Sequence, residues 1–272
     1  MKLIKLTDEN DRSHGDTQWG KGVTHTASGQ GNLCNYGWIH AYEDLLVGLM
    51  LNPVHANFRR PHAWKSEGSG EVKRDHGLKI GVTTLTTLRR IAVPVITTEQ
   101  RVRFAILCAA EVYLDSAWRR WAQKWLDGFG RTGGTRALTA SLYLDEPSVA
   151  ASKAKEAALS ALMAARAWIE GEPAATATAA ARAARLAAED VAEAAADAAA
   201  EATEARAAAR VAAVDEQRTN PLDLPALARL AVSKKRIVLA KMPRTRNSLR
   251  RLDRDTVTSA RSRSRSKGDA GR

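Results

Sequence analysis

Short runs of alternating apolar and polar residues occupy residues 1–93. Lys2–Leu6 alternates lysine with aliphatic residues, and Val23–Ala27 and Gly37–Tyr42 follow the same period of two. That period is typical of strands with one face on a core. Segments 64–72 and 80–93 are rich in Thr, Val and Ile, which favour strands. These segments predict a mostly antiparallel sheet.

One short helix is expected among the strands. Glu43 and Asp44 suit a helix N-terminus, and the apolar run Leu45–Leu51 follows them. Asn52-Pro53 is expected to end this helix, because the residue before a proline disfavours helical geometry.

A long helix is predicted from Glu99 to about Leu126, capped by Thr97 or Thr98. It carries three tryptophans at positions i, i+3 and i+7, which share one helix face: Trp118, Trp121 and Trp125. The favoured interpretation of this stripe is a packing seam. The alternative is a platform on which nucleobases stack.

Alanine dominates the segment after Gly171. It supplies 24 of the 40 residues from 174 to 213, so helix propensity is high while little apolar area is available for burial. Helices are predicted over Ser148–Ile169, over this segment and over Leu222–Ala231. Acidic residues recur every four positions and form a stripe on one helix face: Glu189, Glu193, Asp197 and Glu201. This stripe is interpreted either as a solvated face, which is favoured, or as a surface that binds the basic tail.

The predicted fold class is α+β. We expect an α+β domain over 1–96, a Trp-bearing helix packed on it over 97–130, an Ala-rich helical region over 131–231 and a basic disordered tail over 232–272. Whether the Ala-rich region is one helix or a hairpin stays open at this point.

Positive charge is concentrated at the C-terminal end. Residues 234–272 hold 14 Lys or Arg and three acids, whereas the rest of the chain holds 28 basic and 27 acidic residues. Such an arm suits non-specific binding to nucleic-acid phosphates. The candidate nucleic-acid-binding residues are Arg244, Arg246, Arg250, Arg251, Arg254, Arg261, Arg263, Arg265 and Lys267.

The remaining composition points to a soluble chain. Cys34 and Cys108 form no disulfide framework, no apolar run is long enough for a membrane span, and the N-terminus lacks a signal-peptide core. We therefore expect a cytoplasmic protein without a membrane partner. The histidine spacing matches no compact metal-ligand motif, so no metal site is predicted.

One arrangement of residues suits a catalytic site. A strand with His25 precedes an aromatic strand with His40, and Glu71 lies on a later strand. This order, over residues 20–93, resembles the split sheet of ADP-ribosyltransferases. There, His and Tyr position NAD and a Glu orients the nucleophile. The resemblance implies catalytic roles for His25, His40 and Glu71, and cofactor contacts from Tyr36, Trp38 and Tyr42. The alternative is that both histidines are structural.

Five segments carry a broader resemblance: GVTHTASG (22–29), GWIHAY (37–42), LNPVHANF (51–58), the GEV…DHGLKIG stretch (70–81) and TTEQRVRFAILCA (97–109). They are similar to a family of uncharacterised proteins from bacteriophages and actinobacterial genomes. In that family an α+β unit precedes an Ala-rich helical tract. The resemblance implies no established activity, and the Arg/Ser-rich tail departs from the family pattern.

Three functional hypotheses follow. The leading one is a non-enzymatic, phage-type accessory protein that associates with nucleic acid through the basic arm. The second is an ADP-ribosyltransferase-like or dinucleotide-binding module within 20–93, for which NAD would be the cofactor. The third is a protein-interaction or oligomerisation arm made of the Ala-rich helices.

Overall fold

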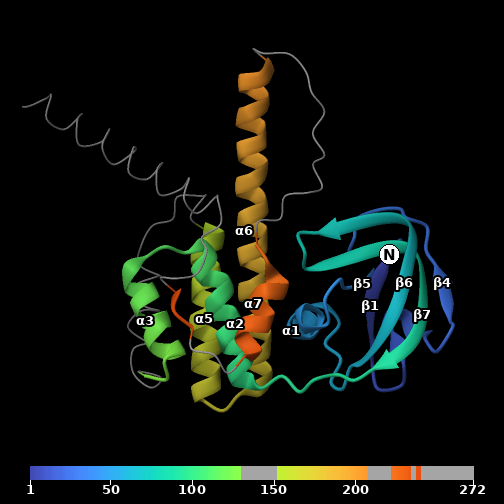
Figure 1. The fold of residues 1–272 in the computed structure, drawn as a ribbon, viewed down its shortest axis with the longest axis horizontal. Coiled ribbons are helices and arrows are strands. Elements are labelled where there is room, and N and C mark those ends of the chain that lie inside the picture. The colour runs from blue at the N-terminus through green and yellow to red at the C-terminus, as the bar shows by residue number, and fades with distance from the viewer. Residues whose placement is uncertain (130–151, 208–221, 234–236, 240–272) are drawn as a thin grey trace, which may run out of the picture.

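The computed structural model describes residues 1–129, 152–207, 222–233 and 237–239, and these form an α+β fold (Figure 1). Strands come first in the chain and helices follow, as predicted. A short helix, α1, lies between the sheet and the other helices (Figure 1). The residues expected to form the basic tail lie almost entirely outside the described part.

All strand pairs in the main sheet are antiparallel, in the order β1-β6-β7-β4, with β5 also paired to β7. A separate two-stranded sheet joins β2 to β3, with a 3-10 turn over His14–Asp16 between them. The strands are β1 (Lys2–Thr7), β2 (Arg12–Ser13), β3 (Thr17–Gln18), β4 (Thr24–Thr26), β5 (Ile39–Ala41), β6 (His62–Asp75) and β7 (Lys79–Ile91).

The sheet closes on itself beside β5. Ile4 of β1 and Tyr42 exchange two backbone hydrogen bonds of 2.8 and 2.9 Å, so β1 is bound on one edge by β6 and on the other by the residue that follows β5. The long β6–β7 hairpin makes this possible because register shifts bend it at Lys65/Ser66 and Ser69/Val72. Gly68 lies in the bend, where a Cβ atom would be 2.7 Å from Leu3.

The two faces of the sheet are covered differently. One encloses a small cluster of its own side chains, including Leu3, Trp19 and Val82. The other packs against α1 through Leu6, Leu49 and neighbouring residues. The sheet therefore buries apolar residues on both faces.

Helix α1 (Leu45–His55) continues past the expected end at Asn52-Pro53. Asp44 caps its start by accepting hydrogen bonds from the amides of Leu46 and Val47, as its position predicted. Pro53 cannot donate to the carbonyl of Leu49, but the Arg101 guanidinium donates to that oxygen instead, at 3.1 Å. The helix thus keeps its geometry with a side chain in place of the missing N–H.

The single helix predicted from Glu99 to Leu126 is in fact two. Helix α2 (Thr98–Val112) begins with the expected Thr97 cap, completed by Gln100. The chain is extended at Tyr113, and Asp115 caps a new helix, α3 (Ser116–Leu126), by accepting from the Trp118 amide at 2.7 Å. The helical periodicity on both sides concealed this cap. The three tryptophans of α3 are all buried, which confirms the packing seam.

The Ala-rich region forms a helix pair. Helix α5 (Ser152–Ile169) turns at Gly171 into α6 (Pro173–Ala207), which answers the open question for this part of the chain. The expectation that little could be buried here was wrong. Many alanines on both helices are fully buried in a core shared with α2 and α3. Small side chains let helix backbones approach closely, so alanines bury each other and the tryptophans.

The acidic stripe of α6 has neighbours within the helix pair. Glu189 pairs with Arg185 on its own helix at 3.5 Å, and Glu193 pairs with Lys153 of α5 at 3.3 Å. The side chains of Asp197 and Glu201 lie outside the described part.

The last described segment returns to the helices. Helix α7 (Leu224–Val232), predicted as a short docking helix, packs against α2 and α1. Arg103 of α2 donates to the carbonyls of Ala231 and Ser233, at 3.0 and 3.2 Å. Farther on, the Gln123 amide of α3 donates to Ile237 O and accepts from Leu239 N. Residues 222–233 and 237–239 are thereby attached to α2 and α3 by side chains that bind main-chain groups.

Candidate functional site

The two histidines proposed as catalytic are both bound to backbone carbonyls. Nε2 of His25, on β4, lies 2.8 Å from Gln18 O, and its ring packs edge-on against Trp19. Nε2 of His40, on β5, bonds Leu33 O, and burial lowers the pKa of His40. These contacts are those of histidines that stabilise loops.

The other proposed site residues are dispersed over the sheet region. Glu71 is exposed on β6, and Tyr36 is 86% exposed and stacked on His14. Trp38 is buried and donates to Gly31 O, while the buried Tyr42 hydroxyl lies 3.1 Å from Nδ1 of His55. In the described part of the chain, no hydrogen bond, ion pair or ring contact joins two of the six predicted residues.

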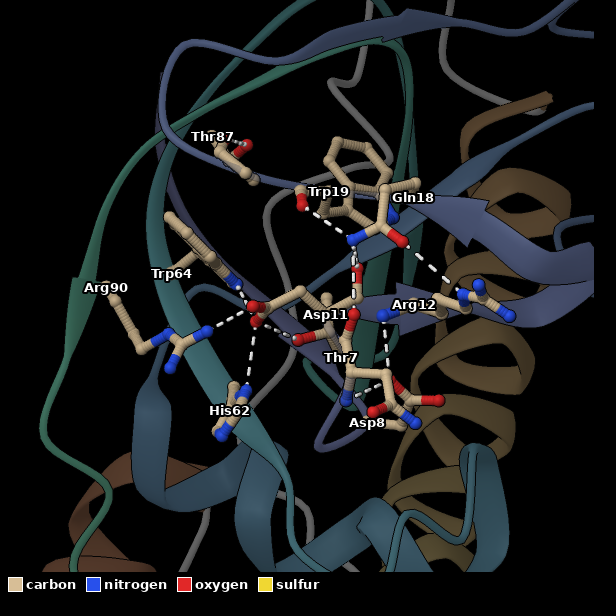
Figure 2. Close-up of polar contacts among 12 residues, drawn as sticks. Thr7, Asp8, Asp11, Arg12, Gln18, Trp19, His62, Trp64, Thr87 and Arg90 are labelled. Atoms are coloured by element: carbon tan, nitrogen blue, oxygen red, sulfur yellow. Dashed lines mark hydrogen bonds and ion pairs between the residues drawn. The ribbon is translucent and has the colours of Figure 1, made fainter.

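A different residue, Asp11, gathers side chains from distant strands (Figure 2). Its Oδ1 lies 2.9 Å from Nδ1 of His62 and accepts from the Trp64 indole N–H at 3.2 Å. Its Oδ2 pairs with the Arg90 guanidinium. The Thr7 hydroxyl donates a longer bond of 3.4 Å. We call these residues the Asp11 hub.

The segment that carries Asp11 is itself ordered by local hydrogen bonds. Asp11 has φ 60°, a left-handed conformation that Asp and Asn tolerate better than most residues. The Asp8 carboxylate accepts from the amides of Asn10 and Arg12, and the Gln18 side chain donates to the carbonyls of Asn10, Asp11 and Trp19. The main chain that carries Asp11 is therefore fixed by contacts within residues 8–19.

The charged side chains of the Asp11 hub, Arg90 and Asp11, each make more than one contact. Arg90 also lies over the Trp64 ring, 5.3 Å from its centroid, and so contacts both an anion and an aromatic face. The Asp11 side chain is only 18% exposed, which strengthens its charge-assisted bonds. His62 receives a fixed orientation because one ring nitrogen is engaged by Asp11.

His62 also lines a pocket of about 350 Å³ between α1, the start of β6, residues 93–96 and α2. Its polar lining residues are Asn52, Arg59, Arg60, His62 and Arg101, and no acid lines it. We call it the arginine pocket. Arg59 and Arg60 are exposed and have no ion-pair partner in the part of the chain that the structure describes.

The walls of the arginine pocket are ordered by buried polar groups. The Asn52 side chain donates to Phe58 O at 2.8 Å and accepts from Phe58 N at 3.1 Å, which fixes the segment leading to Arg59. Arg101 binds the carbonyls of Leu49 and Met50. Burial lowers the pKa of Arg101, yet a guanidinium stays protonated. The site is positively charged and suited to an anion.

Lys5, like Arg101, is a basic side chain that is largely buried. It points from β1 into the small inner core, where Nζ donates to His40 O at 3.0 Å and lies 5.0 Å from the centroid of the Trp19 ring. Burial lowers the pKa of Lys5 to about 8. Lys5 does not line the arginine pocket, and its burial makes it part of the core.

Sequence reasoning missed the Asp11 hub and the arginine pocket. In the sequence, residues 8–11 are only a polar segment after the first predicted strand, and the spacing of the histidines, His62 included, matches no metal-ligand motif. The adjacent cations Arg59 and Arg60, followed by Pro61, were the one local signal. Their convergence with Arg101 depends on contacts that the sequence does not display.

The described residues hold no group of three or more His, Cys, Asp or Glu that could bind a metal ion. Among them, no helix is long and apolar enough to cross a bilayer. Cys34 is exposed and Cys108 buried, both as free thiols. The proposed nucleic-acid-binding residues of the arm lie outside the described part. The chain matches no protein-family model, no curated protein and no solved structure.

Proposed function

We propose that the protein is a non-enzymatic nucleic-acid-associating protein that binds without sequence preference. The main observation that supports this proposal is positive charge on the sheet without a neutralising acidic partner. Lys65 and Arg89 are register partners on β6 and β7, so two exposed cations face each other across the ladder. Neither has an ion pair among the described residues. Like charges in this position are destabilising unless an anion neutralises them.

The cations on the sheet continue toward the arginine pocket. Lys65 is three residues from His62, where β6 begins, and Arg89 is two residues from Ile91, where β7 ends. At ~3.3 Å per residue, Lys65 lies roughly 10 Å along the chain from His62 and Arg89 roughly 13 Å from Val93, the two lining residues of the pocket nearest to them in sequence. A polyanion could contact both surfaces, while the arm residues Arg244–Arg272 supply further phosphate contacts. The phage-type accessory role inferred from resemblance agrees with this proposal.

The test measures binding of the full chain to single-stranded and duplex oligonucleotides by fluorescence anisotropy between 50 and 300 mM salt. We expect similar affinities for unrelated sequences and a steep salt dependence, because each phosphate contact releases counterions. K65Q/R89Q should reduce the salt slope by about one to two. Replacing Arg261, Arg263 and Arg265 with glutamine should reduce it further. Salt-independent binding, or none at 50 mM, would rule the proposal out.

A second candidate is self-association through α6. Helix α5 has 18 residues and α6 has 35, so α5 can cover only about half of α6, which extends past it (Figure 1). Sedimentation equilibrium over a hundredfold concentration range tests this. A mass that rises toward twice the chain mass supports it, and a constant monomer mass excludes it.

A further inference from the structure

We propose that the arginine pocket binds the phosphate group of a nucleotide, as a discrete site separate from the basic arm. This goes beyond non-specific association, because one phosphate would be recognised in a defined place. Its source is either a free mononucleotide or the terminal phosphate of a nucleic-acid strand.

The charge of the pocket favours an anion such as a phosphate monoester. Arg59 and Arg60 are adjacent exposed cations at its edge, and Arg101 adds a third guanidinium from α2. Guanidinium groups present several N–H donors in a planar fork, which matches phosphate oxygens. Asp11, which contacts His62, is already paired with Arg90. Nothing in the lining repels a dianion.

The main chain before Arg59 and the ring of His62 are held in position before a ligand arrives. Asn52 fixes the main chain at Phe58, immediately before the two arginines. Asp11 engages Nδ1 of His62, which leaves Nε2 as the ring atom able to contact a ligand. Preorganisation of this kind lowers the entropy cost of binding.

The rest of the pocket suits the organic part of the ligand. Leu49, Phe58, Val93 and Ile96 contribute apolar lining beside the cations. The volume of about 350 Å³ is at the lower end of the range for small-molecule sites. Apolar walls with cations at one side fit a base and sugar joined to a phosphate better than they fit inorganic phosphate alone.

The test uses isothermal titration calorimetry on the full chain at 150 mM salt, with AMP, adenosine and inorganic phosphate as probes. We expect AMP to bind more tightly than phosphate, and adenosine not to bind measurably. R59Q/R60Q should weaken AMP binding at least tenfold. The matched control K65Q/R89Q removes the same charge from the sheet face and should change it less than twofold.

Two outcomes would overturn the site: R59Q/R60Q binds AMP as the wild type does, or K65Q/R89Q weakens it equally. Absence of AMP binding, together with equal affinity for 5′-phosphorylated and 5′-hydroxyl oligonucleotides, would also overturn it. A preference for the phosphorylated strand that R59Q/R60Q abolishes identifies a strand end as the source. Pocket-dependent AMP binding without that preference identifies a free nucleotide.

The result is separable from the proposed function. R59Q/R60Q leaves the arm intact, so it should retain salt-sensitive, sequence-independent binding even when AMP binding is lost. Both arginines are exposed, and surface substitutions of this type leave stability nearly unchanged. Equal melting temperatures therefore exclude unfolding as the cause of any loss.

Discussion

The sheet region and the helical region reach a buried core by opposite means. Around the sheet, large and polar side chains do the fastening: Asp11 ties three strands together, and Lys5 is buried beneath a tryptophan. In α5 and α6, most buried residues are alanines, and Trp118 and Trp125 fill the space between helices. The core of the sheet region depends on a few specific polar contacts, whereas the core of the helical region depends on the close approach of helix backbones.

This difference shows where each region is vulnerable. A hydrogen-bonded hub fails when one charged atom is removed, because several donors lose their acceptor together. An alanine-packed interface tolerates small polar changes on its outside but has no space for added atoms inside. The four variants below test these two kinds of vulnerability.

The largest effect is expected from Trp118→Ala in the helical region. Trp118 is fully buried and its indole N–H donates to Ala158 O at 3.3 Å, which links α3 to α5. Its removal leaves a cavity that alanine neighbours cannot fill, so we expect a loss of about 3–5 kcal/mol in urea unfolding. Phe129→Ala, at a 70% exposed position, is the control. A loss under about 1 kcal/mol for Trp118→Ala would show that α3 contributes little to this core.

The next effect is a pH dependence in the sheet region. Burial lowers the pKa of Lys5 to about 8 from 10.5, so the folded protein releases this proton at lower pH than the unfolded chain. Below pH 8 the full cost of burying the charge is present. Stability should therefore rise between about pH 8 and 10.5, by about 3 kcal/mol at ~1.4 kcal/mol per pKa unit.

Lys5→Met should lack this rise. The measurement is the difference in unfolding free energy between wild type and Lys5→Met at several pH values. Other titrating groups cancel in that difference. Parallel pH curves for the two proteins would show that Lys5 is hydrated in solution.

Asp11→Asn should destabilise the sheet region by about 1.5–3 kcal/mol, because charge-assisted bonds to His62 and Arg90 are lost. Asparagine tolerates the left-handed backbone, so the effect isolates the charge. Asp16→Asn is a matched control. Asp16 also has a positive φ of 57°, but its side chain is 90% exposed and, among the described residues, pairs only with Arg12. Equal losses for the two variants would mean that the hub contributes no more than a surface pair.

The smallest expected effect comes from adding volume between helices. Ala161 is fully buried on α5, and Ala161→Leu should cost about 1–3 kcal/mol through overpacking. Ala175→Leu, at an exposed position on α6, should be within about 0.5 kcal/mol of wild type. If Ala161→Leu were stabilising, the core would contain unfilled space.

Local sequence signals predicted much of the fold. The strands of the main sheet, the Asp44 and Thr97 caps, the Trp118 seam and helix α7 follow from periodicity and capping residues, whereas the short strands β2 and β3 were not predicted. The break at Asp115 was missed because apolar periodicity continues across it. Burial of the alanines was missed because an alanine contributes little area alone, and the gain comes only when two helices approach closely.

The candidate site was less predictable than the fold. His25 and His40 are conspicuous in the sequence, yet the structure gives both rings backbone partners. Asp11 is inconspicuous in an acidic turn, and its main partners follow 51 to 79 residues later. A contact over such a separation leaves no periodic trace.

The pairing of β1 with β6 has a consequence for folding kinetics. Lys2 pairs with Glu67, whereas α5 and α6 are separated by a short turn around Gly171. Distant pairings pay a larger loop-closure entropy, so they form more slowly than local ones. We expect α5–α6 amides to gain exchange protection before the Ile4–Tyr42 bridge in a pulse-labelling refolding experiment. Simultaneous protection would instead indicate one nucleus spanning both regions.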